Sequence, residues 1–162
     1  MASAESSSLD VGVIRAKREE GAFSYKNAKV IRNQSSVAGM ILSYRLDDPY
    51  IVGDVEDYPE VVRPLVILES KVPGSWYVNA IATNEFQRGK GIAKCLLENT
   101  ETEAQTQGVF QSSLIVASNN IAAKRLYVNL GYEFKASLPV IPYPGCRHGG
   151  DWELMVKKLS II

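Results

Sequence analysis

Cysteine and histidine are scarce in this chain of 162 residues, which contains two cysteines and one histidine. The cysteines lack the spacing of a zinc site or of a disulfide framework, so we expect no metal and a reducing compartment, the cytoplasm. Apolar runs are short as well. None approaches the roughly 18 residues that span a bilayer, and the polar first residues lack the apolar segment of a signal peptide. We therefore expect no membrane partner.

The chain also lacks an excess of charge. Its 18 Lys and Arg residues balance 18 Asp and Glu residues, and no basic cluster occurs, so we do not expect nucleic acid as a partner. What is present is an ordinary globular composition, 46% hydrophobic, in a length that suits one domain. We divide the chain into a serine-rich, disordered or tag-like segment over residues 1–8 and a single domain over residues 9–162.

The stretch from Trp76 to Gln107 organises the domain. Residues 76–83 are rich in β-branched and aromatic side chains and predict a strand, after which Gly89 and Gly91 precede a helical pattern. Glycine lets a ligand approach the backbone closely, and the first N–H groups of a helix are unpaired and lie at its positive end. This arrangement predicts a site for a phosphate-bearing ligand.

Two other phosphate-binding motifs do not fit this stretch. A Walker loop places Ser or Thr directly after Gly-Lys, but Lys90 is followed by Gly91. A dinucleotide fingerprint needs a third glycine where Lys94 stands. For the glycine pair alone, a plain tight turn is the simpler interpretation.

Two longer motifs are more specific than the glycine pair alone. Arg88-x-x-Gly91-x-Ala93 resembles the Arg/Gln-x-x-Gly-x-Gly/Ala signature of the GCN5-related N-acetyltransferase (GNAT) superfamily. A later stretch resembles the second motif of that family: Asn120-x-x-Ala123-x-x-Leu126-Tyr127-x-x-x-Gly131-Tyr132. The two occur in the family's order, and the similarity extends from Tyr25 to Leu159.

The resemblance implies a mixed α/β (α+β) fold: one GNAT-like domain with a mostly antiparallel sheet, a central parallel βαβ unit and flanking helices. The residue patterns predict strands at 27–32, 37–46, 76–83, 111–117, 132–136 and 152–159. They predict a helix over 9–20 and a second over 59–70 that is interrupted at Pro64. A third helix should follow Gly91, with Glu98, Glu101 and Glu103 on its outward face. A fourth should begin after a cap at Ser118 or Asn119.

Relatives open with a strand ahead of the hairpin, and no segment of this sequence predicts that N-terminal strand. The strand at 27–32 would then be a bare sheet edge whose N–H and C=O groups could pair with a second copy. We therefore expect a homodimer.

The resemblance further implies that acetyl-CoA is the co-substrate. The pantetheine arm would pair with the central strand at Ile81, Ala82 and Thr83. Asn120 would hydrogen-bond the same arm, although its spacing suits a polar residue at a helix start equally well. The pyrophosphate would lie on the backbone amides of the glycine turn: Arg88, Gly89, Lys90, Gly91, Ile92 and Ala93.

Tyr127 matches the general acid of the family. A tyrosine with its ordinary pKa of about 10 is protonated at neutral pH and can donate to a leaving thiolate. On helical periodicity alone Tyr127 would be a core aromatic, and the complete second motif favours the catalytic role. For the general base, Glu69, Asp151, His148 and a chain of water molecules all stay open. Cys146 lacks the partners of a catalytic nucleophile.

The acceptor is expected to be a primary amine of a small molecule or peptide that attacks the thioester directly. Residues 47–60 contain six carboxylates and no basic residue. They form either a solvated acidic loop or a mouth that attracts a cationic amine. The predicted function is thus N-acetyl transfer, and the alternative is a non-catalytic acyl-CoA-binding regulatory module.

Overall fold

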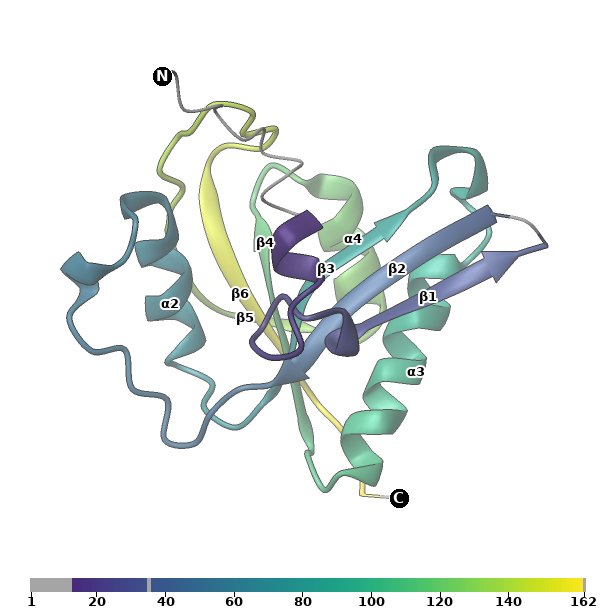
Figure 1. Cartoon of the computed structure of the whole chain (residues 1–162), viewed down its shortest axis with the longest axis horizontal. Coiled ribbons are helices and arrows are strands. Elements are labelled where there is room, and N and C mark those ends of the chain that lie inside the picture. Colours follow the sequence, from purple (N-terminus) through teal and green to yellow (C-terminus); the bar gives the residue numbers. More distant parts are fainter. Residues whose placement is uncertain (1–12, 35, 162) are drawn as a thin grey trace.

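Six strands form one mixed sheet in the order β1-β2-β3-β4-β6-β5 in the computed structural model, which describes residues 13–34 and 36–161 (Figure 1). The strands are β1 (Ala28–Asn33), β2 (Ser36–Arg45), β3 (Trp76–Thr83), β4 (Gln111–Ala117), β5 (Glu133–Pro139) and β6 (Asp151–Lys158). The helices are α2 (Arg63–Glu69), α3 (Ile92–Thr106) and α4 (Ile121–Asn129). The predicted fold class is confirmed, with boundaries that shift by a few residues.

Only β3 and β4 run parallel, because α3 carries the chain from the end of one strand to the start of the other. The predicted helix at 59–70 begins as a 3-10 turn, Glu60–Val62, and α2 then has Pro64 in its first turn, where proline is tolerated. Of the predicted helix over 9–20, residues 13–16 are helical and residues 9–12 lie outside the described part of the chain, as do residues 1–8.

The two faces of the sheet bury separate cores. Helices α3 and α4 cover one face, with Ile41, Leu97 and Leu114 at its centre. Helix α2 covers the other face, where Leu68 packs with Leu154. Figure 1 shows α2 and α3 on opposite sides of the strands. Leu68 and Leu97 are fully buried, and burial of each stabilises the fold by roughly 1.5–3 kcal/mol.

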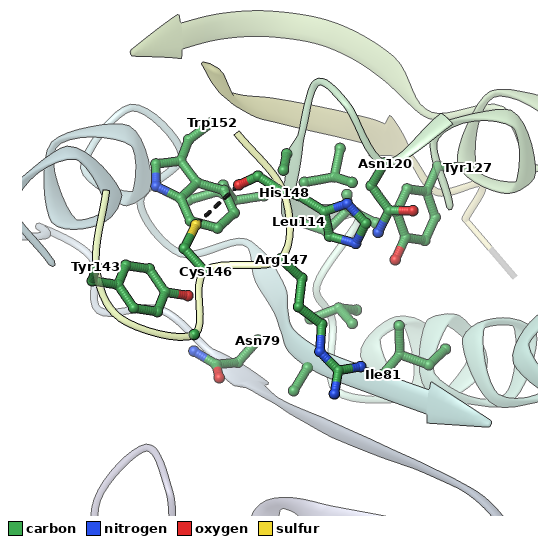
Figure 2. Close-up of a pocket in the computed structure, with 16 residues that line it drawn as sticks. Asn79, Ile81, Leu114, Asn120, Tyr127, Tyr143, Cys146, Arg147, His148 and Trp152 are labelled. Carbon is green, nitrogen blue, oxygen red and sulfur yellow. Dashed lines mark hydrogen bonds between the residues drawn. The ribbon is translucent and has the colours of Figure 1, made fainter. Parts of the chain in front are cut away.

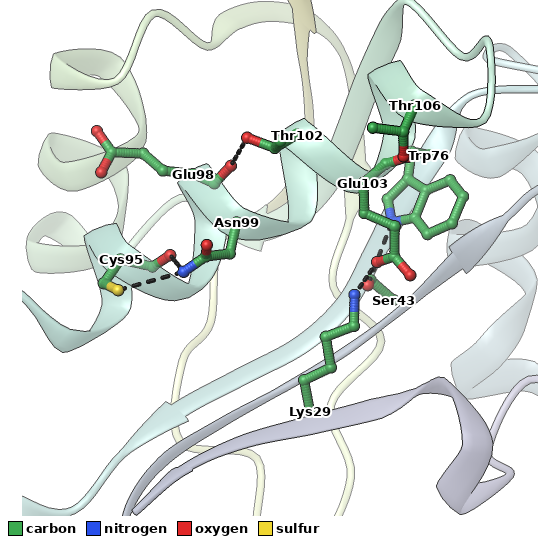
Figure 3. Close-up of polar contacts among 9 residues, drawn as sticks. All are labelled: Lys29, Ser43, Trp76, Cys95, Glu98, Asn99, Thr102, Glu103 and Thr106. Atoms are coloured by element: carbon green, nitrogen blue, oxygen red, sulfur yellow. Dashed lines mark hydrogen bonds and ion pairs between the residues drawn. The ribbon is translucent and has the colours of Figure 1, made fainter.

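Helix α3 shows where the predicted outward face was wrong. Glu101 is 8% exposed and its carboxylate lies 2.5 Å from Lys157 Nζ on β6. The reason is helical periodicity, since Glu101 lies four residues after the buried Leu97 and shares its face. Glu98 is exposed as predicted, and Glu103 pairs with Lys29 of β1 (Figure 3).

The sheet opens at its centre. The parallel pairing of β3 and β4 covers only Trp76–Val78 opposite Ser112–Leu114, and beyond it the strands have no paired residues. A bulge falls at the same point: Leu42 and Ser43 of β2 face Ala80 and Val78, so Asn79 is an extra residue in β3. The sheet is therefore interrupted where the sequence placed the site.

Strand β1 is an edge of the sheet: within the described residues it pairs with β2 alone. The hairpin agrees with the sequence prediction. The predicted homodimer stays a prediction.

Candidate active site

The turn before α3 is built from backbone. Gly89 and Gly91 both have φ of +75°, in the left-handed region that favours glycine, and a Cβ atom at either position would meet no heavy atom within 4 Å. The first intrahelical bond of α3 runs from Cys95 N to Gly91 O, so the amides of Ile92, Ala93 and Lys94 have no acceptor within the helix. The glycines are needed for the path of the chain, and the space beside them is open.

The start of α3 lies unusually close to the sheet. A Cβ atom on Gly39 of β2 would come within 2.7 Å of Ile92 Cγ2 and 3.2 Å of Leu96 Cδ1. Gly39 thus lets the first turn of the helix rest on β2. The sequence did not single out Gly39, because a glycine inside a strand pattern does not reveal which element approaches it.

A groove of about 680 Å³ runs along this turn, the end of β3 and the first two turns of α4. Its walls include ten of the eleven residues that the sequence assigned to the site: Ile81, Ala82, Thr83, Arg88, Gly89, Gly91, Ile92, Ala93, Asn120 and Tyr127. The eleventh, Lys90, does not line the groove, and its Nζ donates to Gln87 Oε1 at 2.8 Å. Arg88 and Lys94 add positive charge, and the first turn of α3 has no acidic residue. We call this the cofactor groove.

A second cavity of about 370 Å³ lies where β3 and β4 diverge, and we call it the acceptor cavity. Ile81, Asn120 and Tyr127 line both it and the cofactor groove, so the two spaces meet at these side chains. Figure 2 shows its walls: strand residues, Tyr127 and Asn120 from the α4 side, and the loop between β5 and β6 with Tyr143, Cys146, Arg147 and His148.

Tyr127 is held firmly at this junction. It is 7% exposed, and its ring packs edge-on against Tyr132 with 6.0 Å between the ring centroids. Burial raises the pKa of Tyr127 to about 12. Its hydroxyl has no hydrogen-bond partner among the described residues, so it can donate to a molecule in either space.

Asn120 is the N-cap of α4, and its side-chain oxygen accepts from Ala123 N at 3.4 Å. The prediction that Ser118 or Asn119 caps this helix was therefore wrong. Ser118 instead accepts from Asp151 N at 2.9 Å and fixes the start of β6. With its oxygen used in the cap, Asn120 keeps its NH₂ group as a donor at the junction.

The candidate bases fall in different places. His148 is exposed and lines the acceptor cavity, on the side of Asn120 and Tyr127 in Figure 2. Asp151 lines neither the groove nor this cavity, and Glu69 lines a separate one. Cys146 Sγ donates to His148 O at 3.0 Å. The proline- and glycine-rich loop gave no periodic signal for the direction of these side chains.

The acidic segment is mostly solvated. Asp54 caps a short 3-10 turn, Glu56 lies 3.5 Å from Arg63, and Asp57 and Glu60 are exposed. Of the six carboxylates, only Asp47 lines a cavity described here. The segment as a whole is therefore a solvated loop and does not form the mouth of the acceptor cavity.

Two features are absent from residues 13–34 and 36–161. No group of three or more His, Cys, Asp or Glu side chains could hold a metal ion. Within the same residues, no helix has the length and apolarity needed to cross a membrane.

Comparison with known proteins agrees with this geometry. The model of the acetyltransferase (GNAT) family matches residues 13–132. No curated protein sequence matches the chain. Among solved structures, a mutant agmatine N-acetyltransferase in its apo form has a TM-score of 0.70 at 16% identity, over 96% of this chain and 84% of the other.

Two more structures have the same fold. A polyamine N-acetyltransferase of Drosophila melanogaster, which forms N-acetylagmatine, has a TM-score of 0.71 at 16% identity, over 98% of this chain and 85% of the other. The protein yncA of Salmonella typhimurium, solved with its cofactor acetyl-CoA, has a TM-score of 0.55 at 20% identity, over 82% of this chain and 64% of the other. Because the family model covers most of the chain, the protein belongs to the acetyltransferase (GNAT) family and is an N-acetyltransferase.

Proposed function

We propose that acetyl-CoA binds in the cofactor groove and that its acetyl group passes to a primary amine in the acceptor cavity. The pyrophosphate would accept hydrogen bonds from the amides of the glycine turn, and Arg88 would add positive charge. The pantetheine arm would lie along Ile81–Thr83, where β4 has moved away from β3. The likeness to a structure that holds acetyl-CoA supports this choice of co-substrate.

One observation carries the proposal: the two spaces meet at Tyr127, Asn120 and Ile81. An acyl donor in one space and a nucleophile in the other would bring the thioester and the amine together at this shared wall. Holding two reactants in contact in this way removes much of the entropic barrier to a bimolecular reaction.

The reaction needs no covalent enzyme intermediate. The amine nitrogen forms a bond to the acetyl carbon, the bond from carbon to sulfur breaks, and the sulfur leaves with its electron pair. Counted from the neutral amine, one proton leaves the nitrogen and one proton arrives on the sulfur. The products are an amide and free coenzyme A.

The raised pKa of Tyr127 defines its role more closely. A thiol has a pKa of about 8.5, so moving a proton from a hydroxyl of pKa about 12 to a thiolate is uphill by roughly 5 kcal/mol. Tyr127 therefore acts best as a hydrogen-bond donor to the sulfur as its charge develops. It gives up its own proton only as the nitrogen, once bonded to the acetyl carbon, delivers another proton to it. The earlier proton, which the ammonium form loses before attack, goes to a separate base.

For the base we propose His148. Removing a proton from a lysine-like amine at pH 7 costs about 4.6 kcal/mol, and histidine is the side chain best suited to accept protons near neutral pH. Among the residues that line the acceptor cavity, His148 is the one such group. Glu69 and Asp151 line neither that cavity nor the groove.

The Tyr127→Phe variant tests the function. It keeps the ring and removes the donor, so thiol release from acetyl-CoA with a primary amine should fall by roughly 10²–10⁴-fold. Binding of acetyl-CoA, measured by calorimetry, should change little. The matched control is Tyr132→Phe, which removes a neighbouring hydroxyl that bonds Ser112 at 2.7 Å outside both spaces. Equal turnover in the wild type and Tyr127→Phe would leave Tyr127 as a core aromatic only.

We also propose a cytoplasmic homodimer that pairs through β1. Support for the assembly comes from the position of β1 at the sheet edge, and support for the compartment comes from the two free cysteines. Light scattering at micromolar concentration measures the assembly, and a monomer would contradict it.

A further inference from the structure

A third cavity, of about 440 Å³, lies between the end of β2 and the end of α2. The side chains of Tyr44, Tyr50 and Glu69 line it, together with Arg45 and Asp47. The reaction described above uses none of these residues. We call it the Glu69 cavity.

Glu69 differs from the other carboxylates that are shielded from solvent. Glu101 lies 2.5 Å from Lys157 Nζ, and Glu153 lies 2.8 Å from Lys124 Nζ. No Lys, Arg or His nitrogen of the described residues lies within 4 Å of the Glu69 carboxylate, which instead accepts from the Tyr50 hydroxyl at 2.6 Å. A shielded carboxylate without a counter-charge is costly, and a cationic ligand would supply that charge.

The pKa values in the cavity agree with the lack of a positive charge beside Glu69. Burial raises the pKa of Glu69, and its hydrogen bonds from Tyr50 and Tyr77 only partly offset that effect. Burial, together with the nearby charge of Glu69, also raises the pKa values of Tyr44 and Tyr50. The tyrosines therefore stay neutral, and their rings can attract a cation.

The charges around the cavity leave Glu69 as the unbalanced group. Arg45 and Asp47 are both exposed at the rim and contribute one charge of each sign. The remaining charge is negative, and Tyr44 and Tyr50 line the same cavity. Alkylammonium and guanidinium groups fit this combination of a carboxylate and aromatic faces.

A hydrogen bond joins this cavity to the site of reaction. Asn79, the extra residue of the β3 bulge, lines the acceptor cavity, and its Nδ2 donates at 3.1 Å to the hydroxyl of Tyr44, which lines the Glu69 cavity. The two residues stand on neighbouring strands, so the two cavities lie on either side of this one pair of side chains. A linear chain with a charge at each end would pass this pair to occupy both.

We propose, building on the acetyltransferase function above, that the acceptor is a linear amine with a second cationic group. The reactive amine lies at Tyr127, and the distal ammonium or guanidinium pairs with Glu69 in the cavity that Tyr44 and Tyr50 line. Glu69 is thus a specificity-determining residue that takes no part in bond formation.

The test compares 1,5-diaminopentane with pentylamine, which has the same chain without the distal charge. Thiol release is measured for both amines with the wild type, with Glu69→Gln and with the control Asp57→Asn, which removes an exposed carboxylate outside the cavity. In the wild type the diamine should have the higher kcat/KM. Glu69→Gln should lower that value about 10- to 100-fold for the diamine and change it less than about threefold for pentylamine. Asp57→Asn should change neither.

Three outcomes would overturn the proposal. The wild type could use both amines equally, or Glu69→Gln could slow both equally, which is the result of a structural role. The wild type could also prefer 5-aminopentanoate and lose that preference in Arg147→Gln. The acceptor would then carry a distal negative charge that pairs with Arg147. Should Glu69→Gln fail to fold, Tyr50→Phe, which removes the donor to Glu69, should reduce the same preference.

Failure of the acetyltransferase function gives a different result. In that case no amine releases thiol from acetyl-CoA, in any variant. Calorimetric titration with 1,5-diaminopentane alone then tests the Glu69 cavity, since binding to the wild type that is lost in Glu69→Gln would still assign the site to a dication.

Discussion

The cofactor groove and the acceptor cavity meet at Tyr127 but are built in different ways. The groove is made mostly of backbone: two glycines at φ +75°, the start of one helix, and a strand with a free side. The acceptor cavity is made of side chains from a strand, a helix and a loop that are distant in sequence. A site made of backbone tolerates change in its side chains, whereas a cavity made of side chains changes its ligand with each substitution. This difference fits a constant co-substrate and an acceptor specific to the protein.

The largest effect should come from the side-chain half of the site. His148→Gln removes the proposed base and keeps a polar side chain of similar shape. We expect turnover at pH 7 to fall about 100-fold, the lower end of the effect of a positioned base. The loss should shrink as the pH approaches about 10.4, where a lysine-like amine loses its proton without help. Turnover against pH is the measurement, and a loss that is independent of pH would mean that His148 only shapes the cavity.

Burial of Tyr127 should appear as a pH-dependent stability. Its pKa in the folded protein is about 12, against about 10 in an unfolded chain. Below pH 10 both states are protonated. Between pH 10 and 12 the unfolded chain loses the proton first, so the free energy of unfolding falls with rising pH. At pH 11.5 the raised pKa of Tyr127 should have lowered the free energy of unfolding by about 2 kcal/mol. Denaturant titrations at pH 9 and pH 11.5 measure how much stability each protein loses over this range. The loss should be about 2 kcal/mol smaller in Tyr127→Phe than in the wild type, and equal losses would contradict the assigned pKa.

A smaller effect should come from the backbone half. Gly91→Ala adds a Cβ that faces the groove at a positive φ, so the dissociation constant for acetyl-CoA should rise about tenfold, and stability should fall by about 1 kcal/mol. Gly108→Ala is the matched control, since Gly108 has φ of +72°, open space around it, and a position at the other end of α3.

Both glycine variants should therefore melt at similarly lowered temperatures, while only Gly91→Ala binds acetyl-CoA more weakly in calorimetry. Equal affinity in the two variants would remove the glycine turn from the proposed cofactor site.

The smallest effect should come from Asn120, which lines both the cofactor groove and the acceptor cavity. Asn120→Asp keeps an N-cap oxygen and replaces the NH₂ donor, so stability should stay within about 0.5 kcal/mol while acetyl-CoA affinity falls about fivefold. Asn120→Ala should in addition lose about 1 kcal/mol of stability with the cap. Thermal unfolding and calorimetry separate the two roles, and unchanged affinity in Asn120→Asp would leave only the cap.

The sequence predicted what depends on neighbours along the chain. The glycines before α3, the β-branched and aromatic residues of β3 and the second motif all act locally along the chain, and these predictions located the groove and Tyr127. It could not predict what depends on distant segments. Gly39 matters because Ile92 lies against it, and Glu101 is buried because Lys157 reaches it from β6.

The loop between β5 and β6 shows the same limit. Its prolines and glycines identify a loop, but the position of His148 in the acceptor cavity depends on where β4 and β6 place the loop ends. The sequence did offer His148 as one of several bases, and tertiary structure was needed to separate it from Glu69 and Asp151.

The divergence of β3 from β4 has a consequence for hydrogen exchange. In an antiparallel strand, alternate N–H groups point toward each neighbour, and from Ala80 to Thr83 one neighbour is β2 and the other is absent. Half of these amides are therefore protected by β2, while the alternate ones should exchange with solvent nearly as fast as a loop. A ligand arm that pairs with this side would slow those alternate amides alone, so exchange measured residue by residue would show a two-residue period that appears with acetyl-CoA.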